Sequence, residues 1–166
     1  MAGDFYYDEK TDELFFIIRN LTENTGAIYV YKNGETKKLD MPHENIFCFQ
    51  LTNNAIYYSP YNPIYYGQSA NPAHIAAGIG LYDFTGGKIY VTDRNTRAET
   101  TLIFDCGKDF YIYTESRSYI IVGDYLYFRK LTLVEENGLV YFNLILGVDK
   151  VRINLKENTI KHLKFE

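Results

Sequence analysis

The sequence predicts an all-β, antiparallel fold built from three repeated four-strand meanders, with a β-sandwich or a β-barrel as alternatives. The 166 residues include 17 Tyr and 11 Phe, and aromatic and β-branched side chains favour half-buried pleated surfaces. Short apolar runs alternate with Asx or Gly turns, which is the short-range pattern of β-hairpins. One strand pattern also recurs, because Ile28 is followed 61 positions later by Ile89 and 62 positions further on by Val151. A recurrence of that length indicates an internal repeat.

Each of the three units opens with a predicted hairpin. The strands of these hairpins span 5–7 with 14–18, 46–51 with 56–58, and 119–122 with 126–128. In each hairpin an Asp or Asn stands two residues ahead of the second strand, at Asp12, Asn54 and Asp124. Such side chains hydrogen-bond the turn backbone and tolerate left-handed conformations, so a structural role explains all three.

A second predicted hairpin closes each unit, and its first strand alternates between apolar and polar residues. These hairpins span 28–31 with 36–39, 89–92 with 100–103, and 151–155 with 160–163. The last strands of the first and third units carry lysines, at Lys37, Lys38, Lys161 and Lys164. Lysines of this kind guard an exposed sheet edge against pairing with another molecule.

The units form a single all-β domain over residues 1–166, because a chain of this length supports one sizeable core. They span about 4–41, 44–104 and 108–166, and unit two carries an insertion at 59–87.

Three further segments depart from the plain repeat. Pro72 and Gly78 bracket a short helix expected inside the insertion, since Pro is favoured just inside a helix and Gly just outside it. In unit three, the runs 132–134 and 139–142 lengthen the two middle strands. The run 110–113 has a strand-like composition but no place in the repeat.

Two motifs resemble those of a known family. The stretch 89–93, Ile-Tyr-Val-Thr-Asp, resembles the Tyr-Val-Thr-Asn and Tyr-Trp-Thr-Asp repeats of bacterial surface-layer and lipoprotein-receptor β-propellers. The segments 12–16 and 124–128, Asp-x-Leu-Phe/Tyr-Phe, resemble repeats of other bacterial propellers. The resemblance implies blade-like meanders and carries no catalytic residue across. Because about four to eight blades close a propeller, three units imply part of a larger propeller, two copies that pair, or a sandwich or barrel.

Composition excludes several function classes. The net charge is −4 and basic residues are scattered singly, whereas nucleic-acid binding needs a clustered basic face. The sequence has no signal-peptide pattern and no long apolar run, so a cytoplasmic location without membrane attachment is the default expectation. Cys48 and Cys106 lack zinc or redox spacing and are expected to be reduced, buried thiols. No cofactor or metal motif is found.

The Tyr-rich start of the insertion is the best candidate for binding, because Tyr beside Asn, Gln, Ser and Gly is typical of adaptable recognition surfaces. The candidate ligand-binding residues are Tyr58, Tyr61, Asn62, Tyr65, Tyr66 and Gln68, with His74 further along the insertion. A structural alternative is that each adjacent tyrosine pair places one ring in the core and one on the opposite face of a strand.

The leading functional hypothesis is a noncatalytic binding or assembly module that recognises a protein, a glycan or a small ligand through this insertion. One alternative is a hydrolase acting on carbohydrate through two carboxylates such as Asp83 and Asp93. No nucleophile or metal motif supports an enzyme. A third hypothesis is a structural piece of a larger β assembly, for which a viral or phage origin is one option.

The repeat also predicts association, because the two terminal units have faces that no neighbouring unit covers. We expect a homodimer or attachment to another chain, or else closure of the monomer by strand 5–7 pairing beside 160–165.

Overall fold

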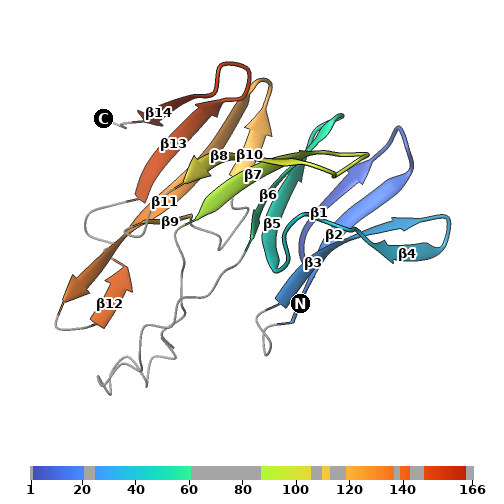
Figure 1. Cartoon of the computed structure of the whole chain (residues 1–166), viewed down its shortest axis with the longest axis horizontal. Helices are drawn as coiled ribbons and strands as arrows, with labels where there is room; N and C mark the ends of the chain where they lie inside the picture. Colours follow the sequence, from blue (N-terminus) through green and yellow to red (C-terminus); the bar gives the residue numbers. More distant parts are fainter. Residues whose placement is uncertain are drawn as a thin grey trace.

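The structure, a computed structural model, describes residues 2–20, 25–60, 87–105, 110–112, 119–136, 139–142 and 148–163. Within these ranges it contains fourteen β-strands and no helix, so the all-β prediction is confirmed (Figure 1). The strands form three separate antiparallel sheets, one for each predicted unit. None of the described segments is a helix long and apolar enough to cross a membrane.

The first sheet is the simplest of the three meanders. Its strands, in the order β1-β2-β3-β4, are β1 (Ala2–Asp8), β2 (Glu13–Asn20), β3 (Thr25–Lys32) and β4 (Glu35–Lys38). Asp12 in the β1–β2 turn has φ 54°, and Asn33 and Gly34 in the β3–β4 turn have φ 52° and 85°. These left-handed values suit Asp, Asn and Gly, so the turn chemistry read from the sequence is the chemistry that the fold uses.

The second sheet contains the start and the end of the insertion. Its strands, in the order β5-β6-β7-β8, are β5 (Ile46–Leu51), β6 (Ala55–Pro60), β7 (Lys88–Asp93) and β8 (Thr100–Asp105). Both predicted hairpins are present, and β6 pairs with β7 across the two ends of the insertion. Residues 61–86, with the helix expected between Pro72 and Gly78, lie outside the described residues.

The third sheet has a long middle strand that pairs with more than one partner along its length. Its strands are β9 (Phe110–Ile112), β10 (Tyr119–Val122), β11 (Tyr125–Glu136), β12 (Leu139–Phe142), β13 (Val148–Asn154) and β14 (Thr159–Leu163). The core meander is β10-β11-β13-β14. β11 includes the run 132–134, as predicted, whereas 139–142 forms a separate strand, β12, that pairs with the far end of β11. The run that the sequence left unplaced is β9, which pairs with 130–132 of β11.

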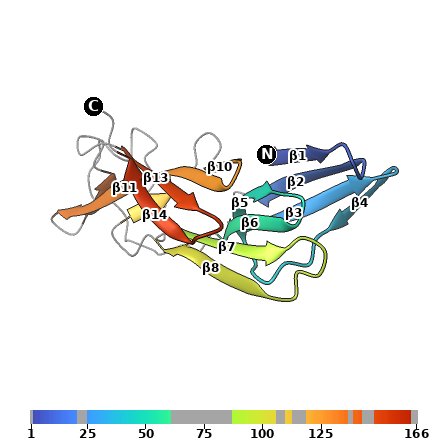
Figure 2. The same cartoon turned by 90° about the horizontal axis from the view of Figure 1, so that it is seen from above.

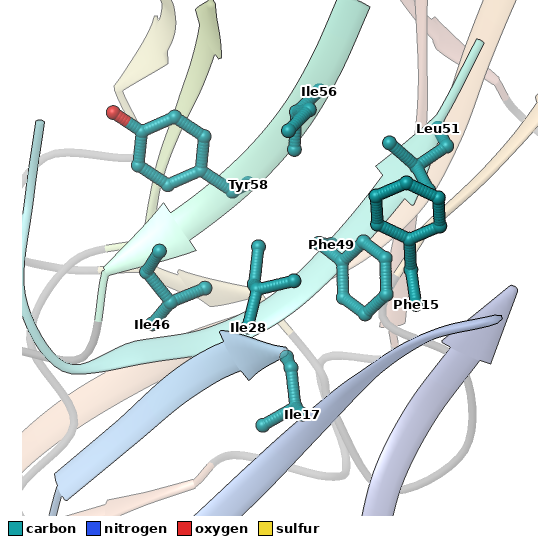
Figure 3. Close-up of a cluster of buried hydrophobic side chains, with 8 residues drawn as sticks. All are labelled: Phe15, Ile17, Ile28, Ile46, Phe49, Leu51, Ile56 and Tyr58. Atoms are coloured by element: carbon teal, nitrogen blue, oxygen red, sulfur yellow. The ribbon is translucent and has the colours of Figure 1, made fainter. Parts of the chain in front are cut away.

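The three sheets pack face to face in series, with the second sheet in the middle (Figure 2). The first core lies between the first and second sheets and consists of Phe15, Ile17, Ile28, Ile46, Phe49, Leu51, Ile56 and Tyr58 (Figure 3). The second core lies between the second and third sheets and consists of Cys48, Ile89, Phe104, Leu126, Phe128, Val151 and Ile153. Cys48 and Phe49 are adjacent in β5 yet belong to different cores, because successive side chains of a strand point to opposite faces.

The sheets do not close on themselves. Within the described residues, β1 hydrogen-bonds only to β2 and β14 only to β13. The barrel alternative is therefore wrong, and the closure expected from strand 5–7 beside 160–165 is not formed.

Strand pairing also fixes which residues of the three sheets are equivalent. Phe16, Tyr58 and Phe128 each lie four residues after the turn residue of their hairpin, Asp12, Asn54 or Asp124, and they pair with Tyr29, Tyr90 and Val151 respectively. The repeat therefore aligns Tyr29, Tyr90 and Val151, at 61 positions each time, and the sequence alignment of Val151 with Ile28 and Ile89 was wrong by one residue. Because a shift of one residue moves a side chain to the other face of a sheet, this correction decides which faces of the three sheets correspond.

A buried ion pair joins the first two sheets beside the first core. Arg94 follows β7, and its side chain is only 8% exposed. Its Nη1 lies 2.6 Å from Asp8 Oδ2, its Nη2 lies 3.3 Å from Glu13 Oε2, and its guanidinium lies 4.7 Å from the centroid of the Phe15 ring. The hydrogen bond from Arg94 holds the pKa of Asp8 below its usual range. This contact therefore fixes the sheets in one relative position.

Replacing Arg94 by Met should lower the thermal unfolding temperature more than replacing Lys37 by Met. R94M leaves the carboxylates of Asp8 and Glu13 without their shared cation at a buried interface, which is strongly destabilising. Lys37 pairs with Glu35 at 3.4 Å, but both side chains are 74% exposed, and such surface pairs contribute little. Circular dichroism melts of both variants measure the difference, and equal melting temperatures would contradict a stabilising role for the Arg94 contacts.

Candidate functional site

Of the seven candidate residues, the structure describes Tyr58. Tyr61, Asn62, Tyr65, Tyr66, Gln68 and His74 lie outside the described residues. Tyr58 is completely buried in the first core, while its neighbour Tyr57 is half-buried and packs against the second core. Tyr58 is therefore a core residue at the point where the Tyr-rich insertion begins, and its ring is not available to an external ligand in this conformation.

The Tyr58 hydroxyl belongs to a short hydrogen-bond chain. It lies 2.7 Å from His43 Nδ1 and 3.0 Å from Thr100 Oγ1, and the Thr100 hydroxyl lies 3.2 Å from the backbone oxygen of Val91. All three contacts are satisfied if Thr100 donates to Val91, Tyr58 donates to Thr100, and His43 donates from Nδ1 to Tyr58, because each hydroxyl has one hydrogen. This arrangement places the imidazole hydrogen on Nδ1 and leaves Nε2 as the acceptor of a neutral ring.

His43 is held among aromatic rings at the edge of a cavity. Its ring centroid lies 4.3 Å from that of Tyr90, and burial lowers its pKa from the usual value. The cavity, of about 570 Å³, lies between the first sheet and the connection from β4 to β5, and its lining includes Tyr29, Lys38, Met41, His43 and Glu44. Its size is in the range of small-molecule sites. The lining mixes both signs of charge and defines no single ligand chemistry.

Asp93, one of the two acids of the hydrolase hypothesis, caps a turn. Its Oδ1 accepts hydrogen bonds from the backbone nitrogens of Thr96 and Asn95, at 2.8 and 2.9 Å, and from the Thr96 hydroxyl at 3.2 Å. These backbone hydrogen bonds lower its pKa, and its side chain is exposed. A general acid of glycoside hydrolysis needs a raised pKa, so the environment of Asp93 does not suit that role. Asp83 lies outside the described residues.

The side of the first sheet that points away from the second sheet is rich in apolar and aromatic residues. We call it the first-sheet outer face, and it consists of Phe5, Tyr7, Leu14, Phe16, Ile18, Tyr29 and Tyr31. Phe5 is 74% exposed, Tyr7 51%, Ile18 46% and Tyr31 45%. The rings of Phe16 and Tyr29 stack across the β2–β3 pair with their centroids 6.0 Å apart. Leu14, Phe16 and Tyr29 are partly buried, and none of the three described sheets packs against this face.

Most of the equivalent positions are core positions in both other sheets, although Tyr31 corresponds to the buried Thr92 in the second sheet and Ile18 corresponds to Pro60 and Lys130. Strand pairing equates five members of the first-sheet outer face with Phe49, Leu51, Ile56, Tyr58 and Tyr90 of the second sheet, and five with Ile121, Leu126, Phe128, Val151 and Ile153 of the third. Apart from the partly buried Tyr90 and Ile121, each of these side chains is at most 5% exposed. The first sheet therefore has core-type residues on a face that no other described sheet covers.

This face was missed as a candidate site by sequence reasoning, although a signal was present. The run Leu14-Phe15-Phe16-Ile17-Ile18 in β2 is apolar at every position. A continuous apolar run is typical of a strand that is buried on both faces, whereas one-sided burial gives alternation. The run could therefore have indicated that both faces of the first sheet are meant to be covered.

The third sheet has an outer face of different character at the other end of the series. The third-sheet outer face consists of Ile120, Val122, Tyr125, Tyr127, Arg152 and Asn154. Ile120 is 44% and Val122 59% exposed. The guanidinium of Arg152 lies 4.5 Å above the Tyr125 ring, and the Tyr125 and Tyr127 ring centroids are 6.3 Å apart. This face combines apolar area with a cation that lies over an aromatic ring.

Comparison of the sequence with models of known protein families and with curated proteins finds no match. The described residues also contain no cluster of three or more His, Cys, Asp or Glu side chains that could hold a metal ion. The candidate site is therefore defined by the geometry of the chain itself, and the first-sheet outer face is its best-supported element.

Protonation of His43 should make the folded state less stable below neutral pH. Burial lowers the folded-state pKa, so the stabilising contribution of the neutral ring is complete above the unfolded value of about 6.5 and is lost as pH falls below it. Urea unfolding at about pH 7.5 and about pH 5.5 measures this loss.

The matched pair for this experiment is His43→Gln and His162→Gln, since His162 is exposed on β14. H43Q should reduce the difference in unfolding free energy between the two pH values, and H162Q should leave it unchanged. An undiminished pH dependence in H43Q would contradict the assignment.

Proposed function

We propose that this chain is a noncatalytic binding and assembly module, and that its partner covers the first-sheet outer face. The observation that carries the proposal is the match between this face and the equivalent core positions of the second and third sheets. Soluble monomers rarely expose a large contiguous apolar patch without a binding role. Phe and Tyr are also the side chains that protein interfaces favour.

Burial of the exposed side chains supplies part of the free energy that association requires, but not all of it. Full burial of one large apolar side chain contributes about 1.5–3 kcal/mol, so covering the exposed half contributes about 1 kcal/mol. Phe5, Tyr7, Ile18 and Tyr31 together therefore supply about 4 kcal/mol. This sum is at the low end of the association cost of about 4–15 kcal/mol. The partner must then contribute apolar area of its own or make a second contact.

The Tyr-rich insertion is the proposed second contact. Tyr61, Asn62, Tyr65, Tyr66, Gln68 and His74 are its proposed binding residues, and a protein, a glycan or a small ligand are the partner classes. The burial of Tyr58 supports a rigid attachment, because the insertion starts from a strand that is fixed in the first core. The resemblance to β-propeller repeats agrees with an assembly role, since the blades of a propeller are covered by their neighbours.

A photoreactive benzoylphenylalanine at position 5 or position 31 should form a covalent adduct of one defined mass when the chain is irradiated in the cells that produce it. Both positions lie on the first-sheet outer face and should contact the partner within the reach of the probe. The same residue at position 37 is the control, because Lys37 is exposed and pairs with Val30, which points to the opposite face. Mass spectrometry identifies the adduct, and labelling at positions 5 and 31 no greater than at position 37 would contradict the proposal.

A further inference from the structure

We propose that the first-sheet outer face is covered by the third-sheet outer face of a second copy of this chain. Two such contacts, related by a two-fold axis, would close two copies into a ring of six sheets. This inference rests on the proposed function and deepens it, because it names the partner and the surface that the partner uses.

The series of sheets has a direction, which selects the third sheet as the partner surface. Phe15 of the first sheet packs toward the second sheet, and Tyr57 of the second packs toward the third. The equivalent residue of the third sheet is Tyr127, which lies on the third-sheet outer face. The third-sheet outer face thus corresponds to the faces that pack against the next sheet in the series. The first-sheet outer face corresponds to the faces that pack against the preceding sheet.

Pairing the first sheet with the third repeats a packing that this chain already uses twice. Pairing two first-sheet outer faces would bring together two faces of the same kind, and no such contact is present among the three described sheets. When the first sheet of one copy packs on the third sheet of a second copy, one third-sheet outer face and one first-sheet outer face remain free. A two-fold axis brings these two remaining faces together in an identical contact. The closed dimer then forms two contacts for one loss of translational freedom.

The residues beside the cores agree with this order. Between the first and second sheets, Asp8 and Glu13 of the preceding sheet meet Arg94 of the following sheet. Strand pairing places Val122 and Tyr125 of the third sheet at the positions of Asp8 and Glu13. The position of Arg94 in the first sheet is held by the uncharged Asn33. All three positions of the proposed contact are therefore uncharged, and the contact buries no unpaired charge there.

The second and third sheets show that an uncharged version of this corner packs. There, Leu155 occupies the position of Arg94 and packs against the second core. The facing positions of the second sheet are Thr52 and Ala55, which carry no charge. Six sheets also fall within the range of about four to eight that closes a propeller-like ring.

Two single substitutions test the pairing, one on each face. Phe5→Glu places a charge on the first-sheet outer face and Val122→Glu on the third-sheet outer face. Both side chains are largely exposed in one chain, at 74% and 59%, so the fold of a single copy should tolerate the change. Lys37→Glu is the control, because this exposed position lies on neither outer face. Light scattering coupled to gel filtration at micromolar concentration gives the mass.

The wild-type chain and K37E should have twice the 19.3 kDa mass of one chain, and F5E and V122E should each have the mass of one chain. An equimolar mixture of F5E and V122E should recover the dimer, because one of its two contacts then joins two unaltered faces. The dissociation constant of this mixed dimer should be at least about tenfold lower than that of either variant alone.

The other outcomes overturn the proposal and separate it from the proposed function. Loss of the dimer in F5E alone would indicate contact between two first sheets, and loss in V122E alone would indicate contact between two third sheets. A mixture that stays monomeric contradicts the two-contact ring. A monomeric wild-type chain excludes a second copy, and an adduct with another protein at position 5 would then leave the proposed function standing. If either variant has lost its far-ultraviolet circular dichroism, Phe5→Ser and Val122→Ser replace it.

Discussion

The second sheet is apolar on both faces, and the rest of the structure follows from the need to cover it twice. In β5 the buried Phe49 faces the first sheet and the buried Cys48 faces the third. In β6 and β7, Tyr58 and Ile89 make the same division. Apolar area on two sides of one sheet cannot be buried in a two-layer sandwich, because one side would remain in water. Three sheets in series bury both faces of the middle sheet. Each terminal sheet then has one face that no neighbouring sheet covers, and in the first sheet this is the first-sheet outer face.

Polar contacts fix how the covered faces meet. Arg94 reaches from the second sheet to Asp8 and Glu13 of the first, and the chain from His43 through Tyr58 and Thr100 satisfies the hydroxyls at the other end of the same interface. Buried polar groups are costly unless they are paired, so each contact favours one relative position of the sheets. The backbone approaches closely as well, because a Cβ added at Gly26 would collide with the carbonyl oxygen of Ile46. The same close fit is expected wherever the outer face of the first sheet is covered.

Local chemistry made the strands predictable, and packing between sheets made the site difficult to predict. Asp12 and the Asn33-Gly34 turn have the left-handed conformations that their residue types favour, so the hairpins followed from short-range pattern. The predicted alignment of Val151 was wrong by one residue. β13 is apolar at both Val151 and Ile153, and an alternating pattern alone does not fix the register of a repeat. Tyr58 was a binding candidate because of its Tyr-rich neighbours, yet its partners His43 and Thr100 come from distant parts of the chain. The apolar run 14–18 indicates burial on both faces of the first sheet, but the exposure of Phe5 depends on which sheets are present, and local sequence does not specify that arrangement.

Hydroxyl-radical footprinting can show whether the first-sheet outer face is buried like a core face in the native protein. Oxidation rates of Phe5, Tyr7 and Tyr31 in the native protein can be compared with those of Phe49 and Tyr58, which are at most 2% exposed. The three outer-face side chains should be protected at micromolar concentration and become reactive on dilution, while Phe49 and Tyr58 stay protected throughout. Rapid oxidation of Phe5 at every concentration, at the rate expected of a side chain that is 74% exposed, would contradict this burial.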